Sequence, residues 1–165
     1  MADRVDQLVQ MAREIASADP EFQVVKGPSD GDHKTAAYIR ELQRRAAEAF
    51  GIDCGEQKIC GPTNYAVDFY LTTEKTVVEV ALGLPNPSSE YEKDILKAII
   101  AKDYVPVERL VFISRAGGEK KCGQPGRTAL KTWALTKHSL RIDVIDLGGL
   151  PRKRKRKRER VSASR

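Results

Sequence analysis

Residues 64–82 carry the clearest structural signal in the chain, and they read Asn64-Tyr-Ala-Val-Asp68-Phe-Tyr-Leu-Thr-Thr-Glu-Lys-Thr-Val-Val-Glu79-Val-Ala-Leu82. Two parts of this stretch, 65–71 and 76–82, are rich in β-branched and aromatic residues, which favour extended backbone. The short polar segment between them suits a turn. We therefore expect two antiparallel strands joined as a hairpin, and the interpretation of the other segments starts from this pair.

The register of the hairpin determines which side chains face each other. If Thr73 and Glu74 form a two-residue turn, Asp68 lies directly opposite Glu79 on one face, with Cβ atoms about 5 Å apart. Like charges so placed destabilise a sheet, and a divalent cation or a shared proton would compensate. Both carboxylates interrupt apolar runs typical of strands buried on both faces. A structural salt bridge to a helix Lys or Arg is the alternative.

The spacing of apolar residues predicts the remaining elements. The expected helices are 3–18, 32–50, from Ser88 or Ser89 to about Lys102, and 128–138. The expected strands are 56–60, 65–71, 76–82, 108–114 and 140–147. Asp32 is expected to cap the second helix, and 117–126 to form a glycine-rich basic loop. A three-stranded meander followed by a crossover helix predicts an α/β fold, a mixed β-sheet flanked by helices.

The order helix, three-stranded meander, helix and strand, with Asp68 on the second strand and Glu79 on the third, resembles the PD-(D/E)xK nuclease superfamily. The resemblance covers residues 32–114 and implies the restriction-endonuclease-like fold. It also implies that Asp68 and Glu79 bind Mg²⁺ or Mn²⁺, with the main-chain carbonyl of Val80 as a further ligand. The implied activity is that of a metal-dependent DNA endonuclease, which hydrolyses phosphodiester bonds.

This chain departs from the family's pattern at two positions. Val67 replaces a proline that has no chemical role, whereas Ala81 replaces the motif lysine. Some members of the superfamily supply that lysine from the following helix. Helical spacing here places Glu92 within the apolar arc, Lys93 at its edge and Lys97 beyond it. We therefore expect Lys93 to be the catalytic lysine and Glu92 an added acid. The alternative for Glu92 is a favourable interaction with the helix dipole.

The missing motif lysine leaves a second function open. The same fold can persist as a catalytically inactive nucleic-acid-binding or interaction module, in which Ala81 marks the lost activity. Asp68 and Glu79 would then bind no metal, and one of them would be protonated or salt-bridged. A dependence of thermal stability on Mg²⁺ or Mn²⁺ separates the two hypotheses.

Positive charge is concentrated at the C-terminus. Segment 151–165 has nine basic residues and one acidic residue, so it carries 9 − 1 = +8, and the total of +6 leaves residues 1–150 with 6 − 8 = −2. Such a run is expected to be disordered and to bind phosphates, although a nuclear address and a merely solvated end are alternatives. The expected nucleic-acid contacts are Arg152, Lys153, Arg154, Lys155 and Arg156, with Lys120, Lys121 and Arg127 in the basic loop, which is otherwise a solvated turn.

Length and composition limit the class of protein. A chain of 165 residues suits one domain, 1–150, followed by the basic tail 151–165. The sequence has no apolar run that could span a membrane and no signal-peptide segment. Its three cysteines lack disulfide-framework or zinc-site spacing. We expect DNA as the partner, no membrane association and a cytoplasmic location, or a nuclear one in a eukaryote. A homodimer is left open, because many nucleases of this fold cut one strand with each subunit.

Overall fold

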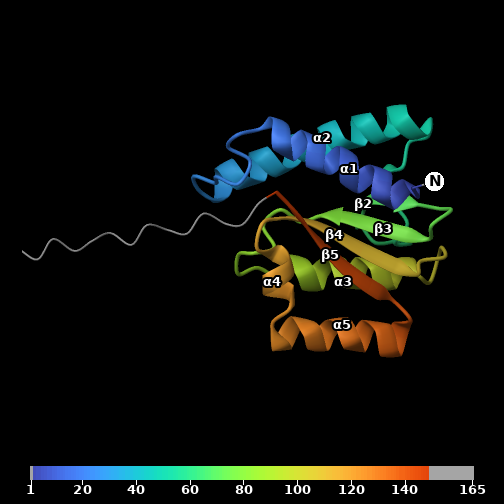
Figure 1. The fold of residues 1–165 in the computed structure, drawn as a ribbon. Helices are drawn as coiled ribbons and strands as arrows, with labels where there is room; N and C mark the ends of the chain where they lie inside the picture. The colour runs from blue at the N-terminus through green and yellow to red at the C-terminus, as the bar shows by residue number, and fades with distance from the viewer. Residues whose placement is uncertain (1, 149–165) are drawn as a thin grey trace, which may run out of the picture.

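Helices cover both faces of a single β-sheet in the computed structural model of the protein, which describes residues 2–148 (Figure 1). The elements are α1 (Arg4–Ala18), α2 (Pro28–Phe50), β1 (Gly55–Gln57), β2 (Val67–Leu71), β3 (Thr76–Val80), α3 (Glu90–Ala101), β4 (Arg109–Arg115), α4 (Gly118–Cys122), α5 (Pro125–His138) and β5 (Arg141–Leu147). Helices α1 and α2 lie on one face, and α3, α4 and α5 lie on the other (Figure 1). The predicted α/β class, with a mixed sheet flanked by helices, is confirmed.

The five strands lie in the order β1-β2-β3-β4-β5. The first three form an antiparallel meander, whereas β4 is parallel to β3 and β5 is parallel to β4. Leu71 pairs with Thr76, which confirms the predicted hairpin register. The N–H of Lys75 donates to the carbonyl of Thr72 across the turn at 3.2 Å. Lys75 also has a positive φ of 48°. The turn therefore forms although the sequence lacks the Asn-Gly pair that primed turns prefer.

Side chains alternate between two buried clusters, one on each face of the sheet. Phe69, Leu71 and Val78 pack against α1 and α2, together with Leu8 and Leu42. On the opposite face, the second cluster joins the sheet to α3 and α5 through Val77, Ala81, Phe112, Tyr91 and Ala134. The face to which a strand residue belongs follows from its position in the alternation, except at the start of β2, where Val67 packs in the second cluster.

The first two helices begin and end for identifiable local reasons. Asp3 caps α1, because its carboxylate accepts a hydrogen bond from the N–H of Asp6 at 2.8 Å. The predicted start of α2 is wrong, since this helix begins at Pro28 and Asp32 lies inside it rather than at its cap. Proline is well suited to the first helical turn, where its missing N–H leaves no bond unmade. The predicted end is confirmed, because Gly51 adopts a left-handed φ of 67° there.

The expected basic loop at 117–126 is largely helical, so that prediction is wrong. Residues Gly118–Cys122 form α4, and α5 begins at Pro125. The carboxylate of Asp146 stabilises the start of α4. It accepts hydrogen bonds from the N–H groups of Gly117 at 3.0 Å and Glu119 at 2.9 Å. This contact comes from the end of β5 and is not visible in the local sequence.

Two further expectations meet the limits of the described residues. Within residues 2–148, no helix is long and apolar enough to cross a membrane. The basic tail 151–165, with the predicted contacts Arg152, Lys153, Arg154, Lys155 and Arg156, lies outside the described residues.

Candidate functional site

Asp68 and Glu79 meet on the face of the sheet that α3 covers. The last backbone pair of the hairpin is Phe69 with Val78, and one further step in the same register places Asp68 opposite Glu79. Here side chains replace the backbone ladder: the N–H of Val80 donates to Asp68 Oδ2 at 2.8 Å, and the N–H of Asp68 donates to Glu79 Oε2 at 3.4 Å. The two carboxylates are therefore neighbours at the same end of β2 and β3, as the sequence predicts.

A lysine from α3 lies against this pair. Lys97 Nζ is 2.7 Å from Glu79 Oε1 and 3.0 Å from Asp94 Oδ1. All three side chains are buried, with 2% of Glu79, 4% of Asp94 and 7% of Lys97 exposed. Among the described residues, the ammonium of Lys97 is the one close partner of Glu79 Oε1. The short contact with Lys97 is thus an ion pair in which this oxygen keeps unused acceptor capacity.

Burial gives these carboxyl groups unusual proton affinities. It raises the pKa of Asp68 and of Asp94. It raises the pKa of Glu79 well above its ordinary value, and the charges of Asp94 and Asp68 raise it further. Burial alone would lower the pKa of Lys97, but the charges of Glu79 and Asp94 outweigh it and raise that pKa. The lysine is therefore held in its charged form by the acids around it.

A fourth carboxyl group, that of Glu90 at the start of α3, connects this cluster to solvent. Burial raises the pKa of Glu90 to about 7, with the charge of Asp94 acting in the same direction. Glu90 also lines a cleft of about 730 Å³ between the first turns of α2 and the loop that follows β3. The carboxyl ends of parallel strands are where open α/β sheets bind ligands. The cleft lies at that edge, beside the ends of β3 and β4.

The predicted orientation of α3 is wrong by about one residue. Glu92 and Lys93 are exposed and do not face the sheet, although the charge of Lys93 still lowers the pKa of Asp68. Asp94 and Lys97 face inward instead, while Leu96 is 47% exposed. The apolar pattern fails because it takes no account of the cation that the buried Glu79 requires, and α3 turns Asp94 and Lys97 inward and Leu96 outward. Sequence reasoning thus missed Lys97, Asp94 and Glu90 as members of the cluster.

A signal for Lys97 was nonetheless present in the sequence. A glutamate in the middle of a buried strand needs a buried cation or a proton. Asp94 and Lys97 are spaced i, i+3, so they share one face of a helix. The same spacing joins Glu90 to Lys93, so the pattern offers Lys97 as an alternative to Lys93 without choosing between them.

Arg127 has a structural role rather than the predicted contact with nucleic acid. Its side chain is 9% exposed, and its Nη1–H donates to the carbonyl of Leu84 at 3.0 Å. The guanidinium also lies over the ring of Tyr91, 5.1 Å from the ring centroid. Lys120 is exposed and Lys121 is half-buried on α4. Both remain near the surface, whereas Arg127 joins α5 to the loop before α3.

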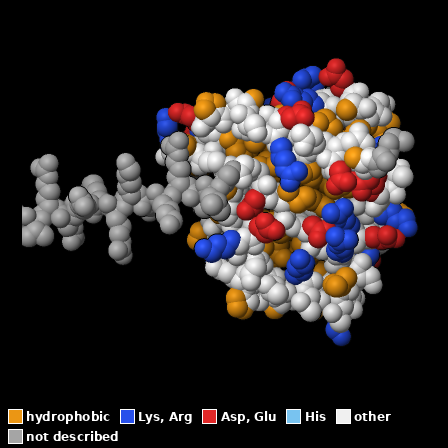
Figure 2. Space-filling model, viewed as in Figure 1, with side chains coloured by type: hydrophobic (Ala, Val, Ile, Leu, Met, Phe, Trp, Pro, Cys, Tyr) orange, Lys and Arg blue, Asp and Glu red, His pale blue; other side chains and the backbone are white. Residues whose placement is uncertain are grey.

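The visible surface has no continuous basic face in the view of Figure 2. Acidic and basic side chains are interspersed over the face that carries β4 and β5. Asp143 Oδ2 on β5 is 2.7 Å from Nε of Arg109 on β4 and 3.2 Å from Nε of Arg141 on its own strand. Two arginines share this one aspartate, so the group keeps a net charge of 2 − 1 = +1, and acidic and basic side chains are interspersed rather than gathered into a basic patch.

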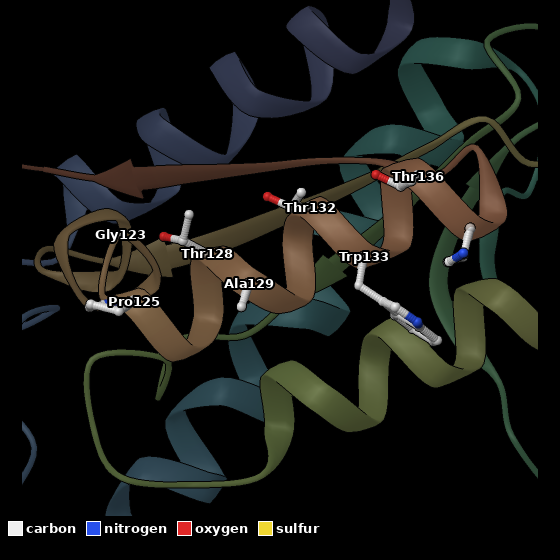
Figure 3. Close-up of a pocket in the computed structure, with 8 residues that line it drawn as sticks. Gly123, Pro125, Thr128, Ala129, Thr132, Trp133 and Thr136 are labelled. Atoms are coloured by element: carbon white, nitrogen blue, oxygen red, sulfur yellow. The ribbon is translucent and has the colours of Figure 1, made fainter.

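A second hollow, on α5, lacks the groups that hydrolysis would need. Thr128, Thr132 and Thr136 lie along one side of the helix, and Trp133 points away from them toward α3 (Figure 3). The residues that line it include Lys137 but no carboxylate and no histidine. The acid cluster beside the cleft is therefore the better candidate for chemistry.

The donor atoms of the cluster fit a magnesium ion in kind. Among residues 2–148, no group of three or more His, Cys, Asp and Glu side chains is arranged to hold a metal. Mg²⁺, however, is usually bound through one or two carboxylates together with water and substrate phosphates. Asp68 and Glu79 supply two neighbouring carboxylates, and Glu79 Oε1 has unused acceptor capacity. These residues therefore suit a metal that a substrate helps to hold.

Comparison of the chain with protein-family models, with curated proteins and with solved structures gave no match in any of the three.

Proposed function

We propose that the protein is a metal-dependent phosphodiesterase that hydrolyses DNA. The observation that supports this most is the 2.7 Å contact between Lys97 Nζ and Glu79 Oε1. It places a cation beside the carboxylate pair, although Ala81 occupies the position at which the PD-(D/E)xK pattern has its lysine. Two acids and a lysine at one end of a hairpin are the groups that metal-assisted phosphodiester hydrolysis uses.

Each residue has a distinct role in this proposal. Asp68 and Glu79 would hold Mg²⁺ or Mn²⁺, which polarises a phosphate and lowers the pKa of a bound water. Lys97 stabilises negative charge that develops on the phosphate oxygens. Glu90 lines the cleft and changes protonation near pH 7. Its carboxyl group is thus suited to accept or donate a proton there.

The test is cleavage of plasmid and linear DNA by the full chain, with Mg²⁺, with Mn²⁺ and with EDTA. We expect cleavage only with a metal. Asp68→Asn should abolish cleavage while leaving DNA binding unchanged. Lys97→Ala should lower the rate at least 100-fold, whereas the matched control Lys93→Ala should stay within threefold of the wild type. Normal cleavage by Asp68→Asn would contradict the assignment of the site.

A non-catalytic module of the same architecture is the second candidate function. It is supported by the ion pairs of Lys97 with Glu79 and Asp94, which neutralise charge in the cluster without a metal. This candidate predicts that Mg²⁺ and Mn²⁺ leave the melting temperature of the full chain unchanged. A metal that binds the folded state alone raises that temperature, so a rise that Asp68→Asn abolishes would exclude the second candidate.

The proposed partner is DNA, held by the basic tail 151–165 as well as by the cleft. A homodimer would allow each subunit to cut one strand of a duplex. The corresponding location is the cytoplasm, or the nucleus if the organism is eukaryotic. Sedimentation of the full chain, with and without duplex DNA, tests the dimer directly.

A further inference from the structure

Arg115 is a buried charge at the end of β4, and the acid cluster does not involve it. Its side chain is 7% exposed. The Nε–H donates to the carbonyl of Phe22 at 2.8 Å, and the guanidinium lies over the Phe22 ring, 5.3 Å from its centroid. An arginine has five N–H donors, so this hydrogen bond uses one of them. The other four N–H groups, on the two terminal nitrogens, take no part in it.

No acid in the described part of the chain neutralises Arg115 by direct contact. Among residues 2–148, none of the ion pairs includes it. Asp30 and Asp19 are the acids near enough to affect its pKa, but both carboxylates have other partners. Asp30 Oδ2 is 3.2 Å from Lys34 Nζ, and Asp19 Oδ1 accepts a hydrogen bond from the N–H of Glu21 at 3.0 Å. A buried positive charge without a paired acid is unfavourable, and a bound anion would compensate it.

The free side of Arg115 opens into cavities. Arg115 lines both the 730 Å³ cleft and an adjoining hollow of about 250 Å³. Its terminal nitrogens form no hydrogen bond within residues 2–148, and neither is sealed from solvent. Water in these cavities therefore reaches a fixed guanidinium, and a guanidinium can hold two phosphate oxygens at once.

A second source of positive potential opens into the same cleft. Gly27 lines the cleft and is the N-cap of α2, a helix of 23 residues, and no side chain caps this end. Pro28 has no N–H, and that of Gly31 donates to the carbonyl of Gly27 at 3.0 Å. The N–H groups of Ser29 and Asp30 are therefore the ones without an acceptor in the helix, and such groups attract anions. Thr35 and Ser88 add hydroxyl groups to the lining. Arg115 and the N-terminus of α2 thus provide hydrogen-bond donors in the same cleft.

We propose that this part of the cleft is a phosphate-binding subsite formed by Arg115 and the N-terminus of α2. Its ligand is a phosphate group, supplied either by the backbone of a nucleic acid or by a terminal phosphate. Asp32 and Glu90 line the cleft, and the carboxylate of Asp30 accepts a hydrogen bond from the N–H of Lys26 beside the start of α2 at 3.1 Å. All three repel anions when ionised, so the phosphate must lie against the guanidinium of Arg115. This goes beyond the proposed function, because binding here requires neither a metal nor hydrolysis.

The subsite and the acid cluster lie at the same end of the parallel strands, but Arg115 packs against Phe22 on the α1/α2 face, whereas Glu79 faces α3. Glu79 pairs with Phe112 in the sheet, and Arg115 follows Phe112 by three residues, which is about 10 Å along a strand. A phosphate at Arg115 would thus lie about 10 Å or more from Asp68 and Glu79, so the subsite is separate from the acid cluster.

The test is an NMR titration of the isotope-labelled full chain in EDTA, first with inorganic phosphate and then with a dinucleotide that has an internal phosphate but no terminal one. We expect the amide signals of Ser29, Gly31 and Thr35 and the Arg115 Nε signal to shift saturably. Shifts with inorganic phosphate indicate a terminal phosphate as ligand, and shifts with the dinucleotide indicate the backbone. Shifts confined to the tail, or no shifts with either probe, would overturn the proposal.

Two substitutions at Gly27 make the test independent of Arg115, whose removal endangers the Phe22 contact. A Cβ at Gly27 meets no atom within 4 Å, and its φ of 160° suits any residue. Gly27→Asp places a carboxylate at the start of α2, which caps the helix and competes with phosphate. We expect it to raise the melting temperature and weaken phosphate binding at least tenfold, while Gly27→Ala stays within twofold of the wild type. Equal binding by the two variants would refute the subsite. The metal titration above tests the proposed function separately.

Discussion

The ammonium group of Lys97 lies between two carboxylates that water hardly reaches, those of Glu79 and Asp94. Removing one partner of a buried ion pair leaves uncompensated charge and typically costs about 3–5 kcal/mol. Lys97→Ala should therefore lower the free energy of unfolding by roughly that amount at pH 7, as measured by urea denaturation. The loss should shrink at lower pH, because the two acids then take up protons.

Lys93→Ala is the matched control for this substitution, because Lys93 is exposed on the same helix. Its stability should be almost that of the wild type. Equal losses in the two variants would mean that the cluster does not depend on Lys97. A Lys97→Arg variant that regains stability but not DNA cleavage would separate charge compensation from catalysis.

Glu90 gives the protein a pH dependence near neutrality. Its pKa is raised from 4.5 to about 7 in the folded state, so the folded protein binds this proton more tightly than the unfolded chain does. The resulting stability is fully present below about pH 4.5 and is lost as the pH rises through about 7. Glu90→Gln should therefore gain about 1–2 kcal/mol relative to the wild type between pH 5 and pH 8, allowing for solvent screening.

Denaturation of both proteins across this pH range measures the gain. The same pH profile in wild type and variant would show that the Glu90 carboxyl is not shifted. Asp68, Glu79 and Asp94 also have raised pKa values. The variant should therefore keep part of the slope and lose the part centred near pH 7.

The orientation of α3 determines which of its residues stabilise the fold. Ile95 is 3% exposed and Leu96 is 47% exposed, although the two are adjacent and similar in size. Ile95→Ala should cost about 2–4 kcal/mol of stability, because it removes buried methyl groups and leaves a cavity. Leu96→Ala should cost less than about 0.5 kcal/mol. Thermal melting of both variants tests the orientation, and a loss for Leu96→Ala as large as that for Ile95→Ala would contradict it.

Elements with a strong local signal were predictable from the sequence. The hairpin register was predictable once a two-residue turn at Thr73 and Glu74 was assumed, because the length of the turn fixes which residues pair. The end of α2 at Gly51 was also predictable, since glycine tolerates the left-handed backbone there. Both signals lie within a few residues of the feature that they specify.

Features that depend on distant contacts were not predictable. Helix α4 depends on Asp146, which reaches it from β5. The inward orientation of Lys97 depends on Glu79, which lies on a strand. Arg127 belongs to a basic segment by sequence, yet it binds the carbonyl of Leu84. In each case a partner remote in the sequence outweighed the local pattern.

For the protein as a whole, the separation of charge predicts how DNA binding responds to salt. Segment 151–165 carries +8, while residues 1–150 carry −2. Each phosphate neutralised contributes about −0.9 to the slope of log K against log salt concentration. Deleting 151–165 should thus flatten the slope by up to roughly 7 units. Fluorescence anisotropy between 50 and 200 mM salt, roughly the usual range for such titrations, measures this. An unchanged slope would indicate that residues 2–148, rather than the tail, contact the phosphates.

The mixed sheet also affects the order in which the chain folds. Leu71 and Thr76 pair across a short turn, whereas β3–β4 and β4–β5 pairs join residues more than thirty positions apart. Short loops close at a lower entropic cost, so the hairpin is expected to form early and α3 to dock later. Asp68 and Glu79 would then approach each other before Lys97 arrives. Mild acid should accelerate refolding in stopped-flow experiments, because protonation removes a repulsion that the folding chain meets before its lysine is in place.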